Sequence, residues 1–163
     1  MGGPAACAPT DSPVINLSPI RSEQIEDLIR LEALTTPHPW SEAALRGSLQ
    51  GGANCLLIQQ DELNVGYLVV QSVEDEAELL NLVIFHPYGS QGHGRAAMLA
   101  LQRRLRDAGI HTLHLEVRAA NTIARTLYEK TGFTQLGVRA AYYPGSTPDE
   151  GRDDAILMCC RCA

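Results

Sequence analysis

The sequence has no surplus of basic residues, because 13 Lys and Arg stand against 19 Asp and Glu, for a formal net charge of −6 at pH 7. Without a general basic surface, we expect no direct nucleic-acid binding. No apolar run approaches the roughly 20 residues that a transmembrane helix needs, and the first residues do not combine a basic segment with an apolar core. We therefore expect a cytoplasmic protein with no membrane anchor and no secretory signal.

Cysteine patterns that bind metal are also missing. The five cysteines are an odd number, and Cys159, Cys160 and Cys162 crowd one end of the chain without a second spaced pair. Zinc sites usually need spaced pairs together with further ligands. We expect unpaired thiols in a reducing cytosol and no bound metal.

The residues that are present fit one domain. A chain of 163 residues with 45% hydrophobic and 20% charged residues can bury a core and is ordinary for a globular protein. Residues 1–13 contain Gly, Pro, Ala and Ser but few large apolar groups, so we expect a disordered tail there. Residues 14–163 show no repeat and no second domain, so we expect them to form a single domain.

Hydrophobic periodicity and capping residues predict a mixed α/β fold. The expected strands are 14–17, 55–59, 65–70, 78–85, 112–117, 134–140 and 155–160. The expected helices are 22–34, a short one between Ser41 and Gly51, 94–108 and 121–131. A strand meander followed by strand–helix alternation predicts one sheet with helices around it.

A glycine-rich loop, Gly92-His93-Gly94-Arg95, opens the helix that follows the strand at 79–84. A helix N-terminus has free backbone N–H groups, and the helix dipole adds to their attraction for a phosphate. The loop lacks the Gly-Lys-Ser/Thr ending of a Walker motif and the full Gly-x-Gly-x-x-Gly of a Rossmann fold. Taken alone, it is either a tight turn or a phosphate site.

Two residues on neighbouring elements are suited to acid–base chemistry. Glu116 shares one face of its strand with His114, away from the apolar side chains. Tyr128 follows on the next helix, which ends at Thr131-Gly132-Phe133. A carboxylate and a phenol on rigid elements can divide the roles of base and acid. Taken singly, Glu116 is equally a solvated surface group, Tyr128 a packing residue, and His114 a packing or surface residue.

Together these features resemble the GNAT acetyltransferases, which use acetyl-CoA. The resemblance covers roughly residues 15–158, and within the family it is to the branch that acetylates the N-terminal alanine of a small-subunit ribosomal protein. It implies the GNAT fold, with a mixed, mostly antiparallel central sheet flanked by helices. The segments that carry it are Pro39-Trp40-Ser41, Leu80-Asn81-Leu82, Gly92-x-Gly94-Arg95, Leu115-Glu116-Val117-Arg118-Ala119, Asn121, Leu127-Tyr128-Glu129, Gly132-Phe133, Arg139-x-x-Tyr142-Tyr143-Pro144 and Asp154-Ala155.

The resemblance also implies the site residues. For catalysis, it implies Glu116 as the base, acting directly or through water, and Tyr128 as the acid for the leaving thiolate. For the peptide, it implies contacts with Trp40, Tyr142 and Tyr143. For acetyl-CoA, it implies contacts with Leu82, Val83, Ile84, Ser90, Gln91, Gly92, His93, Gly94, Arg95, Asn121 and Tyr128.

Two segments depart from the family pattern. The family loop usually begins with Gln or Arg and carries a further basic residue, whereas this chain has Gly89 followed by Ser90 and Gln91. A pyrophosphate would therefore meet backbone amides and Arg95, with fewer side-chain donors. The preceding strand commonly ends in Asp-Pro in the family, whereas Phe85-His86-Pro87 lacks the acid here.

The chemistry favours an N-terminal amine as the acceptor. A protein α-amine has a pKa of about 7.7–8.0 and a lysine about 10.4, so neutralising the α-amine at pH 7 costs roughly 3.5 kcal/mol less. One modestly tuned carboxylate then suffices. The acidic run of Asp149, Glu150, Asp153 and Asp154 favours basic residues after the first, or forms a solvated loop.

Two other functions remain open from the sequence. One is a GNAT enzyme that acetylates lysine or a small-molecule amine, which the Tyr142-Tyr143-Pro144 segment argues against. The other is a non-catalytic acyl-CoA-binding module, which the weakened glycine loop would permit. The retained Glu116 and Tyr128 argue against that second alternative.

Overall fold

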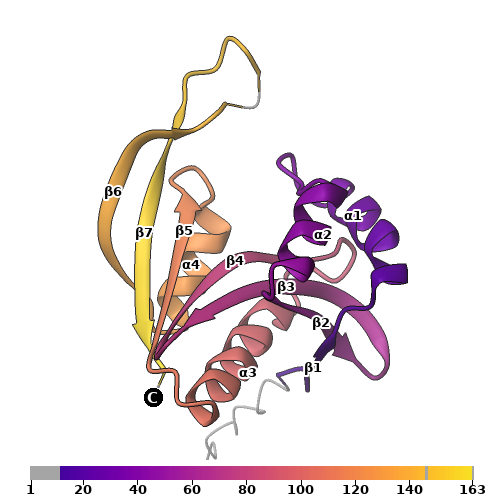
Figure 1. Cartoon of the computed structure of the whole chain (residues 1–163). Helices are drawn as coiled ribbons and strands as arrows, with labels where there is room; N and C mark the ends of the chain where they lie inside the picture. Colours follow the sequence, from indigo (N-terminus) through magenta and orange to yellow (C-terminus); the bar gives the residue numbers. More distant parts are fainter. Residues whose placement is uncertain (1–11, 146, 163) are drawn as a thin grey trace, which may run out of the picture.

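The computed structural model describes residues 12–145 and 147–162. Figure 1 shows the path of the chain through its strands and helices. The tail predicted at residues 1–13 lies outside the described residues, apart from Ser12 and Pro13.

The described elements follow the order that the sequence predicts. The strands are β1 (Asn16–Pro19), β2 (Asn54–Gln60), β3 (Leu63–Val73), β4 (Glu76–Ile84), β5 (Thr112–Arg118), β6 (Thr134–Tyr143) and β7 (Asp153–Arg161). The helices are η1 (Ser22–Gln24), α1 (Ile25–Ala33), α2 (Glu42–Gln50), α3 (His93–Asp107) and α4 (Thr122–Lys130). The first strand begins two residues later than predicted, and the first helix begins with the 3₁₀ turn η1.

The described strands form a seven-stranded sheet in the order β1-β2-β3-β4-β5-β7-β6. The β4–β5 pair is parallel and the other pairs are antiparallel. The predicted mixed, mostly antiparallel sheet is confirmed. Because β7 lies between β5 and β6, residues from both neighbours meet across it; Arg118 and Arg139 both pair in register with Ala155.

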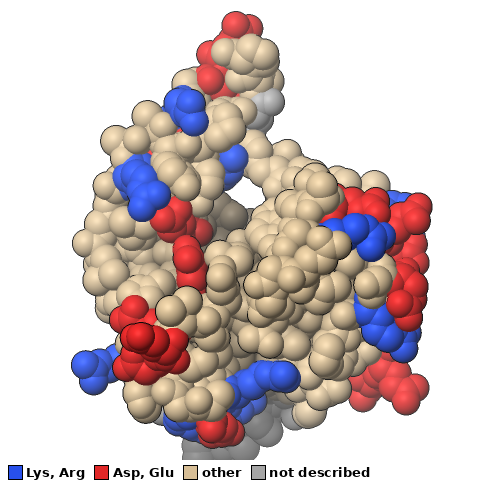
Figure 2. Space-filling view, viewed as in Figure 1, with Lys and Arg blue, Asp and Glu red and all other residues tan. Residues whose placement is uncertain are grey.

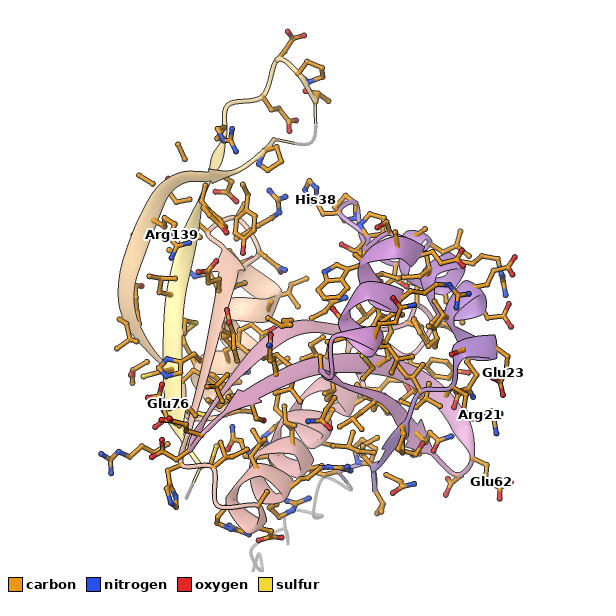
Figure 3. The ribbon with its side chains drawn as sticks, in the orientation of Figure 1. Arg21, Glu23, His38, Glu62, Glu76 and Arg139 are labelled. Atoms are coloured by element: carbon orange, nitrogen blue, oxygen red, sulfur yellow. The ribbon has the colours of Figure 1, made fainter. Side chains whose placement is uncertain are left out.

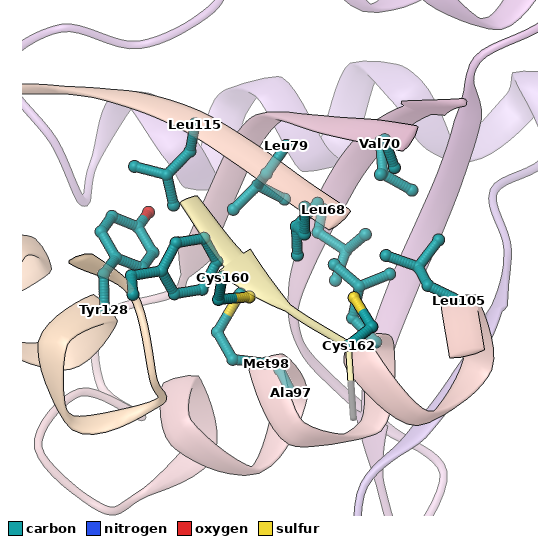
Figure 4. Packing of buried hydrophobic residues seen from close by; sticks show 14 of the residues in the cluster. Leu68, Val70, Leu79, Ala97, Met98, Leu105, Leu115, Tyr128, Cys160 and Cys162 are labelled. Atoms are coloured by element: carbon teal, nitrogen blue, oxygen red, sulfur yellow. The ribbon is translucent and has the colours of Figure 1, made fainter. Parts of the chain in front are cut away.

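One apolar cluster fills the space between the sheet and helices α3 and α4. The strand alternation in β5 places Leu113, Leu115 and Val117 in this cluster, as predicted. Figure 4 shows Leu115 near Tyr128 of α4, with Met98 of α3 in the same cluster. Burial of this face of β5 turns the opposite face, which carries Glu116, away from α3 and α4.

A second cluster covers only part of the opposite face. Helices α1 and α2 contribute Leu28 and Leu45, which pack over β2, β3 and β4. Beside them, over the end of β3, the start of β4 and strands β5, β6 and β7, this face carries a hollow of about 460 Å³. Figure 2 shows acidic side chains between the β6–β7 side of the molecule and helices α1 and α2. The hollow is lined by Gln71, Val73, Glu76, Ala77, Glu78, His114, Leu115, Glu116, Leu136, Leu157 and Met158.

Strands β4 and β5 run together only at their start. Glu76–Leu79 pairs with Thr112–Leu115, and beyond these residues the two strands diverge (Figure 1). On its other side, β4 pairs with β3 with a register shift between Leu79 and Asn81, which leaves Leu80 as the extra residue of a bulge. A bulge bends its strand and increases the local twist. The edge of Leu82–Ile84 that faces β5 is therefore free of strand pairing with β5.

Candidate active site

Glu116 lies on β5 just past the point where β4 departs. Its side chain is 23% exposed, and the Arg139 Nη2 atom lies 3.3 Å from its Oε1 atom. Arg139 comes from β6, so the β5-β7-β6 order creates this ion pair. Figure 3 shows Arg139 on the β6–β7 side and Glu76 near the lower end of the open face. The sequence marked Arg139 as a family residue but did not predict its pairing with Glu116.

Tyr128 lies on α4, on the other side of β5. It is 8% exposed, and its ring centroid lies 5.5 Å from that of Phe133. Burial, together with the neighbouring Tyr143, raises the pKa of the Tyr128 phenol above its usual range. The phenol therefore stays protonated at neutral pH and can act as a proton donor.

Tyr142 and Tyr143 form an aromatic pair at the end of β6, with ring centroids 5.0 Å apart. The Arg118 guanidinium lies 4.5 Å from the centroid of the Tyr143 ring, and that of Arg139 lies 4.8 Å from the Tyr142 ring. Burial first, and then the Glu116 charge, raises the pKa of Tyr143. Two arginines and two tyrosines thus build one wall beside Glu116.

The acidic run after β6 is partly used inside the fold. The Asp154 carboxylate accepts a hydrogen bond from the Ala141 backbone N–H at 2.8 Å. The Asp153 carboxylate accepts one from the Ala120 backbone N–H at 3.2 Å. These two residues therefore fix the shape of the wall, and the acidic groups of the hollow are instead Glu76, Glu78 and Glu116. His114 lines the same hollow, 3.6 Å from Glu76.

Trp40 comes from the opposite half of the molecule. It lies in the loop between α1 and α2, packs against the second apolar cluster and is half-buried. Its backbone N–H donates a hydrogen bond to Glu32 Oε1 at 3.1 Å. Figure 3 labels His38 of the same loop, on the side of α1 and α2 that faces β6 and β7. The structure therefore brings Trp40 and the tyrosine wall to the same open side of the sheet, from different halves.

The N-terminus of α3 fits a phosphate group. Gly92 is the N-cap with a φ of 85°, a left-handed conformation that favours glycine. The first helical bond runs from Ala96 N–H to the Gly92 carbonyl at 3.0 Å. The N–H groups of His93, Gly94 and Arg95 precede that bond and have no acceptor within the helix. A Cβ at Gly94 would come within 3.1 Å of a Leu127 methyl, so this glycine also permits α3 and α4 to pack closely.

The other residues implied for the coenzyme show distinct roles. The His93 ring is buried, with Nδ1 3.1 Å from the Tyr88 carbonyl oxygen, so only its backbone faces the loop surface. The Gln91 side chain donates to the Pro87 carbonyl at 3.0 Å. The Asn121 side-chain oxygen caps α4 by accepting from Ala124 N–H at 3.2 Å, so its amide NH₂ is the group able to reach a ligand.

Cys55, Cys159, Cys160 and Cys162 are free thiols in the structure. Burial raises the pKa of Cys160 to about 12, which disfavours its reactive thiolate. Over residues 12–145 and 147–162, no group of three or more His, Cys, Asp or Glu side chains is placed to hold a metal ion. No helix in these ranges is long and apolar enough to cross a membrane.

Comparison with known proteins assigns the family. Residues 17–133 match the sequence profile of the Acetyltransferase (GNAT) family. The chain belongs to the GNAT acetyltransferases. GNAT enzymes take the acetyl group from acetyl-CoA, so this chain is an acetyl-CoA-dependent acetyltransferase. The sequence-based resemblance to the family and the predicted co-substrate are confirmed.

Individual relatives within the GNAT family are similar over most of the chain. The ribosomal protein bS18-alanine N-acetyltransferase of Haemophilus influenzae is 37% identical over 146 residues, which cover 88% of this chain and 97% of that protein. The enzyme of the same name from Escherichia coli K12 is 36% identical over 144 residues, covering 87% and 94%. A crystal structure of the ribosomal-protein-S18-alanine N-acetyltransferase from Escherichia coli matches with a TM-score of 0.82 and 33% identity, covering 92% of this chain and 95% of that chain.

Proposed function

We propose that this chain transfers an acetyl group from acetyl-CoA to the α-amine of an N-terminal alanine on a small-subunit ribosomal protein. One observation carries the proposal: relatives named for ribosomal protein bS18-alanine acetylation match 88% and 87% of this chain at 37% and 36% identity. Residues 14–163 would act as one acetyltransferase domain, and the enzyme would work in the cytoplasm, where ribosomal proteins are made.

Bound acetyl-CoA supplies the acetyl group as an activated thioester. The unpaired backbone edge of Leu82, Val83 and Ile84 would hold the pantetheine arm, together with the Asn121 amide NH₂ and the Tyr128 region of α4. The helix dipole and free N–H groups at the start of α3 suit the pyrophosphate. The residues assigned to that loop are Ser90, Gln91, Gly92, His93 through its backbone, Gly94 and Arg95.

Two residues would handle the protons. An ammonium group has no lone pair, so the substrate amine must lose a proton before it attacks. Glu116 is on the open face and partly exposed, so its carboxylate can accept that proton directly or through a water molecule. Tyr128 is protonated at neutral pH, as tyrosines are, and it would give its phenolic proton to the leaving sulfur. The nitrogen loses its second proton to water as the amide forms, and the Tyr128 phenol regains a proton from water.

The peptide would approach between the Trp40 loop and the Tyr142-Tyr143 wall. Aromatic side chains give a large, rigid contact surface, and tyrosine hydroxyl groups can bond the peptide backbone. Glu76 and Glu78 line the hollow beside Glu116 and favour positively charged residues after the first. A small first residue, alanine above all, would place its amine near the Glu116 carboxylate.

Acetyl transfer to matched peptides tests this proposal. One peptide has a free N-terminal alanine followed by basic residues, a second has a blocked α-amine and a free internal lysine, and a third replaces the basic residues by serine. We expect the first to react fastest, the third more slowly and the second hardly at all. Comparable acetylation of the blocked peptide would identify a lysine acetyltransferase and overturn the proposal.

A further inference from the structure

A carboxyl group is buried beneath the loop that carries Trp40. Glu32 lies at the end of α1 and is 1% exposed. Its Oε1 atom accepts hydrogen bonds from Asn81 Nδ2 at 3.1 Å and from the Trp40 backbone N–H at 3.1 Å. Its Oε2 atom accepts a hydrogen bond from the Tyr67 hydroxyl. Both carboxyl oxygens are thus engaged by fixed donors from three other segments.

In this cluster the Tyr67 hydroxyl both donates and accepts a hydrogen bond. Burial first, and then the hydrogen bond and charge of Glu32, raise the pKa of Tyr67, so its hydroxyl remains a donor. Asn81 Nδ2 also lies 3.0 Å from the Tyr67 hydroxyl and donates to it. Burying a carboxyl group is costly unless its oxygens are hydrogen-bonded, and an apolar side chain would pack α1 at lower cost. A structural role for α1 alone does not account for this choice of residue.

The cluster joins the two sides of the active site. Asn81 stands at the bulge of β4 and directly precedes Leu82–Ile84, the edge assigned to the pantetheine arm. Trp40 belongs to the loop assigned to the peptide. A second contact acts in parallel, because the His86 backbone N–H donates to Thr35 Oγ1 at 3.2 Å and ties the end of β4 to the end of α1. The loop and the strand are therefore fixed to each other through α1.

We propose that Glu32 is a positioning residue, which holds the Trp40 loop at a fixed distance from β4 and so keeps the peptide-binding side of the site in its binding shape. This inference rests on the proposed function, since it uses the peptide and coenzyme sides assigned there. Glu32 touches neither substrate; it acts through Trp40 and Asn81. Its loss changes where the peptide binds, whereas the proton transfers at Glu116 and Tyr128 stay intact.

Variants with matched controls test the role. Glu32→Gln keeps the size of the side chain but places an NH₂ group where one carboxyl oxygen accepts, and Tyr67→Phe removes a single donor. Leu105→Ala is the control, because Leu105 is a buried leucine of α3 in the other apolar cluster, away from Trp40 and the hydrogen-bond cluster. Truncating a buried leucine lowers the stability of the fold. The control therefore shows what a loss of stability alone does to peptide KM and to Trp40 quenching.

The chain contains a single tryptophan, so fluorescence reports on this loop directly. For Glu32→Gln, we expect the KM for the alanine peptide to rise about tenfold, kcat to change less than about threefold, and Trp40 to become more accessible to acrylamide quenching. Tyr67→Phe should raise peptide KM and Trp40 quenching in the same way but by a smaller amount. Leu105→Ala should lower the melting temperature while leaving peptide KM and Trp40 quenching close to wild type.

The outcomes separate this role from a purely structural one. If Glu32→Gln lowers only the melting temperature and leaves peptide KM and Trp40 quenching unchanged, the positioning role is wrong. If no alanine peptide is acetylated even by the wild type, the proposed function fails, yet quenching of Trp40 in Glu32→Gln still decides whether Glu32 holds the loop. Unchanged quenching in that case also overturns the inference.

Discussion

In the half of the molecule formed by β1 to β4 with α1 and α2, Glu32 of α1 is 1% exposed, and both of its carboxyl oxygens accept hydrogen bonds from fixed groups. In the half formed by β5, β7 and β6, the Glu116 side chain is 23% exposed and pairs with Arg139, which is itself 51% exposed. A buried carboxyl group whose two oxygens both accept hydrogen bonds can only fix the positions of its neighbours. A partly exposed one with an exposed ion-pair partner can exchange that partner for a substrate or a proton.

The covering helices cause this difference. Helices α1 and α2 cover their face over β2 and over parts of β3 and β4. The uncovered part of that face, over the end of β3, the start of β4 and strands β5, β6 and β7, bears the hollow that Glu116 lines. Strands β4 and β5 diverge after Leu79 and Leu115. The boundary between the covered half and the uncovered half of the sheet therefore lies beside Leu82–Ile84, the edge proposed to hold the pantetheine arm. The proposed positioning group, Glu32, and the proposed base, Glu116, therefore belong to different halves.

The largest expected effect comes from Glu116→Gln, which removes the base but keeps the shape of the uncovered half. We expect kcat to fall by roughly 10²- to 10⁴-fold, the usual contribution of a general acid or base. Peptide KM and the melting temperature should stay near wild type, because only an exposed ion pair to Arg139 is lost. Initial rates of CoA release measure this. Wild-type turnover in the variant would remove Glu116 from the mechanism.

Tyr128→Phe tests the acid on the covered side of β5. We expect kcat to fall by roughly 10- to 100-fold with similar acetyl-CoA affinity, because the ring packing against Phe133 is retained. Since burial raises the pKa of Tyr128, the wild-type rate should increase as the amine deprotonates and show no fall up to about pH 10. A falling limb near pH 8 that persists in the Phe variant would assign the acid to another group.

Arg139→Met sharpens the contrast by releasing Glu116 from its partner. We expect kcat/KM for the peptide to change about fivefold, while the free energy of unfolding changes by less than ~1 kcal/mol, as is usual for exposed ion pairs. Arg46→Met is the matched control, because Arg46 makes an exposed ion pair with Glu42 at 2.8 Å on α2. Equal kinetic effects in the two variants would mean that Arg139 has no particular role.

The smallest expected effect concerns the start of α3. Arg95→Ala should weaken acetyl-CoA binding about fivefold, corresponding to ~1 kcal/mol, because one exposed cation near the pyrophosphate is lost while the backbone N–H groups remain. Arg103→Ala, on the same helix but beyond its first turns, provides the control. Titration calorimetry with acetyl-CoA measures both variants. A larger loss for Arg103 would place the pyrophosphate elsewhere on the helix.

Local sequence patterns predicted much of this architecture. Strand alternation was enough to place Leu115 in the core and Glu116 on the opposite face, because side-chain direction in a strand depends only on local geometry. The helix predicted at 121–131 is likewise close to the observed α4, Thr122–Lys130, for which Asn121 is the N-cap. The family motifs then connected these elements to acetyl-CoA chemistry.

Contacts across the sheet could not be predicted in this way. The Arg139–Glu116 pair depends on β7 lying between β5 and β6, which no local pattern encodes. The Glu32 cluster draws on Tyr67 and Asn81, which are 35 and 49 residues away along the chain. The inward turn of the His93 ring depends on Tyr88 and the packing beneath the loop. Each of these features is set by tertiary contacts rather than by propensity or motif.

The central claim is that Glu32 and Glu116 have different roles. Its most direct test is to measure the steady-state kinetics of Glu32→Gln and Glu116→Gln side by side on one alanine peptide. The account predicts that Glu116→Gln lowers kcat by at least about 10²-fold with peptide KM nearly unchanged. It predicts that Glu32→Gln raises peptide KM about tenfold with kcat nearly unchanged. If both substitutions alter the same parameter to a similar extent, the two carboxyl groups share one role and the account is contradicted.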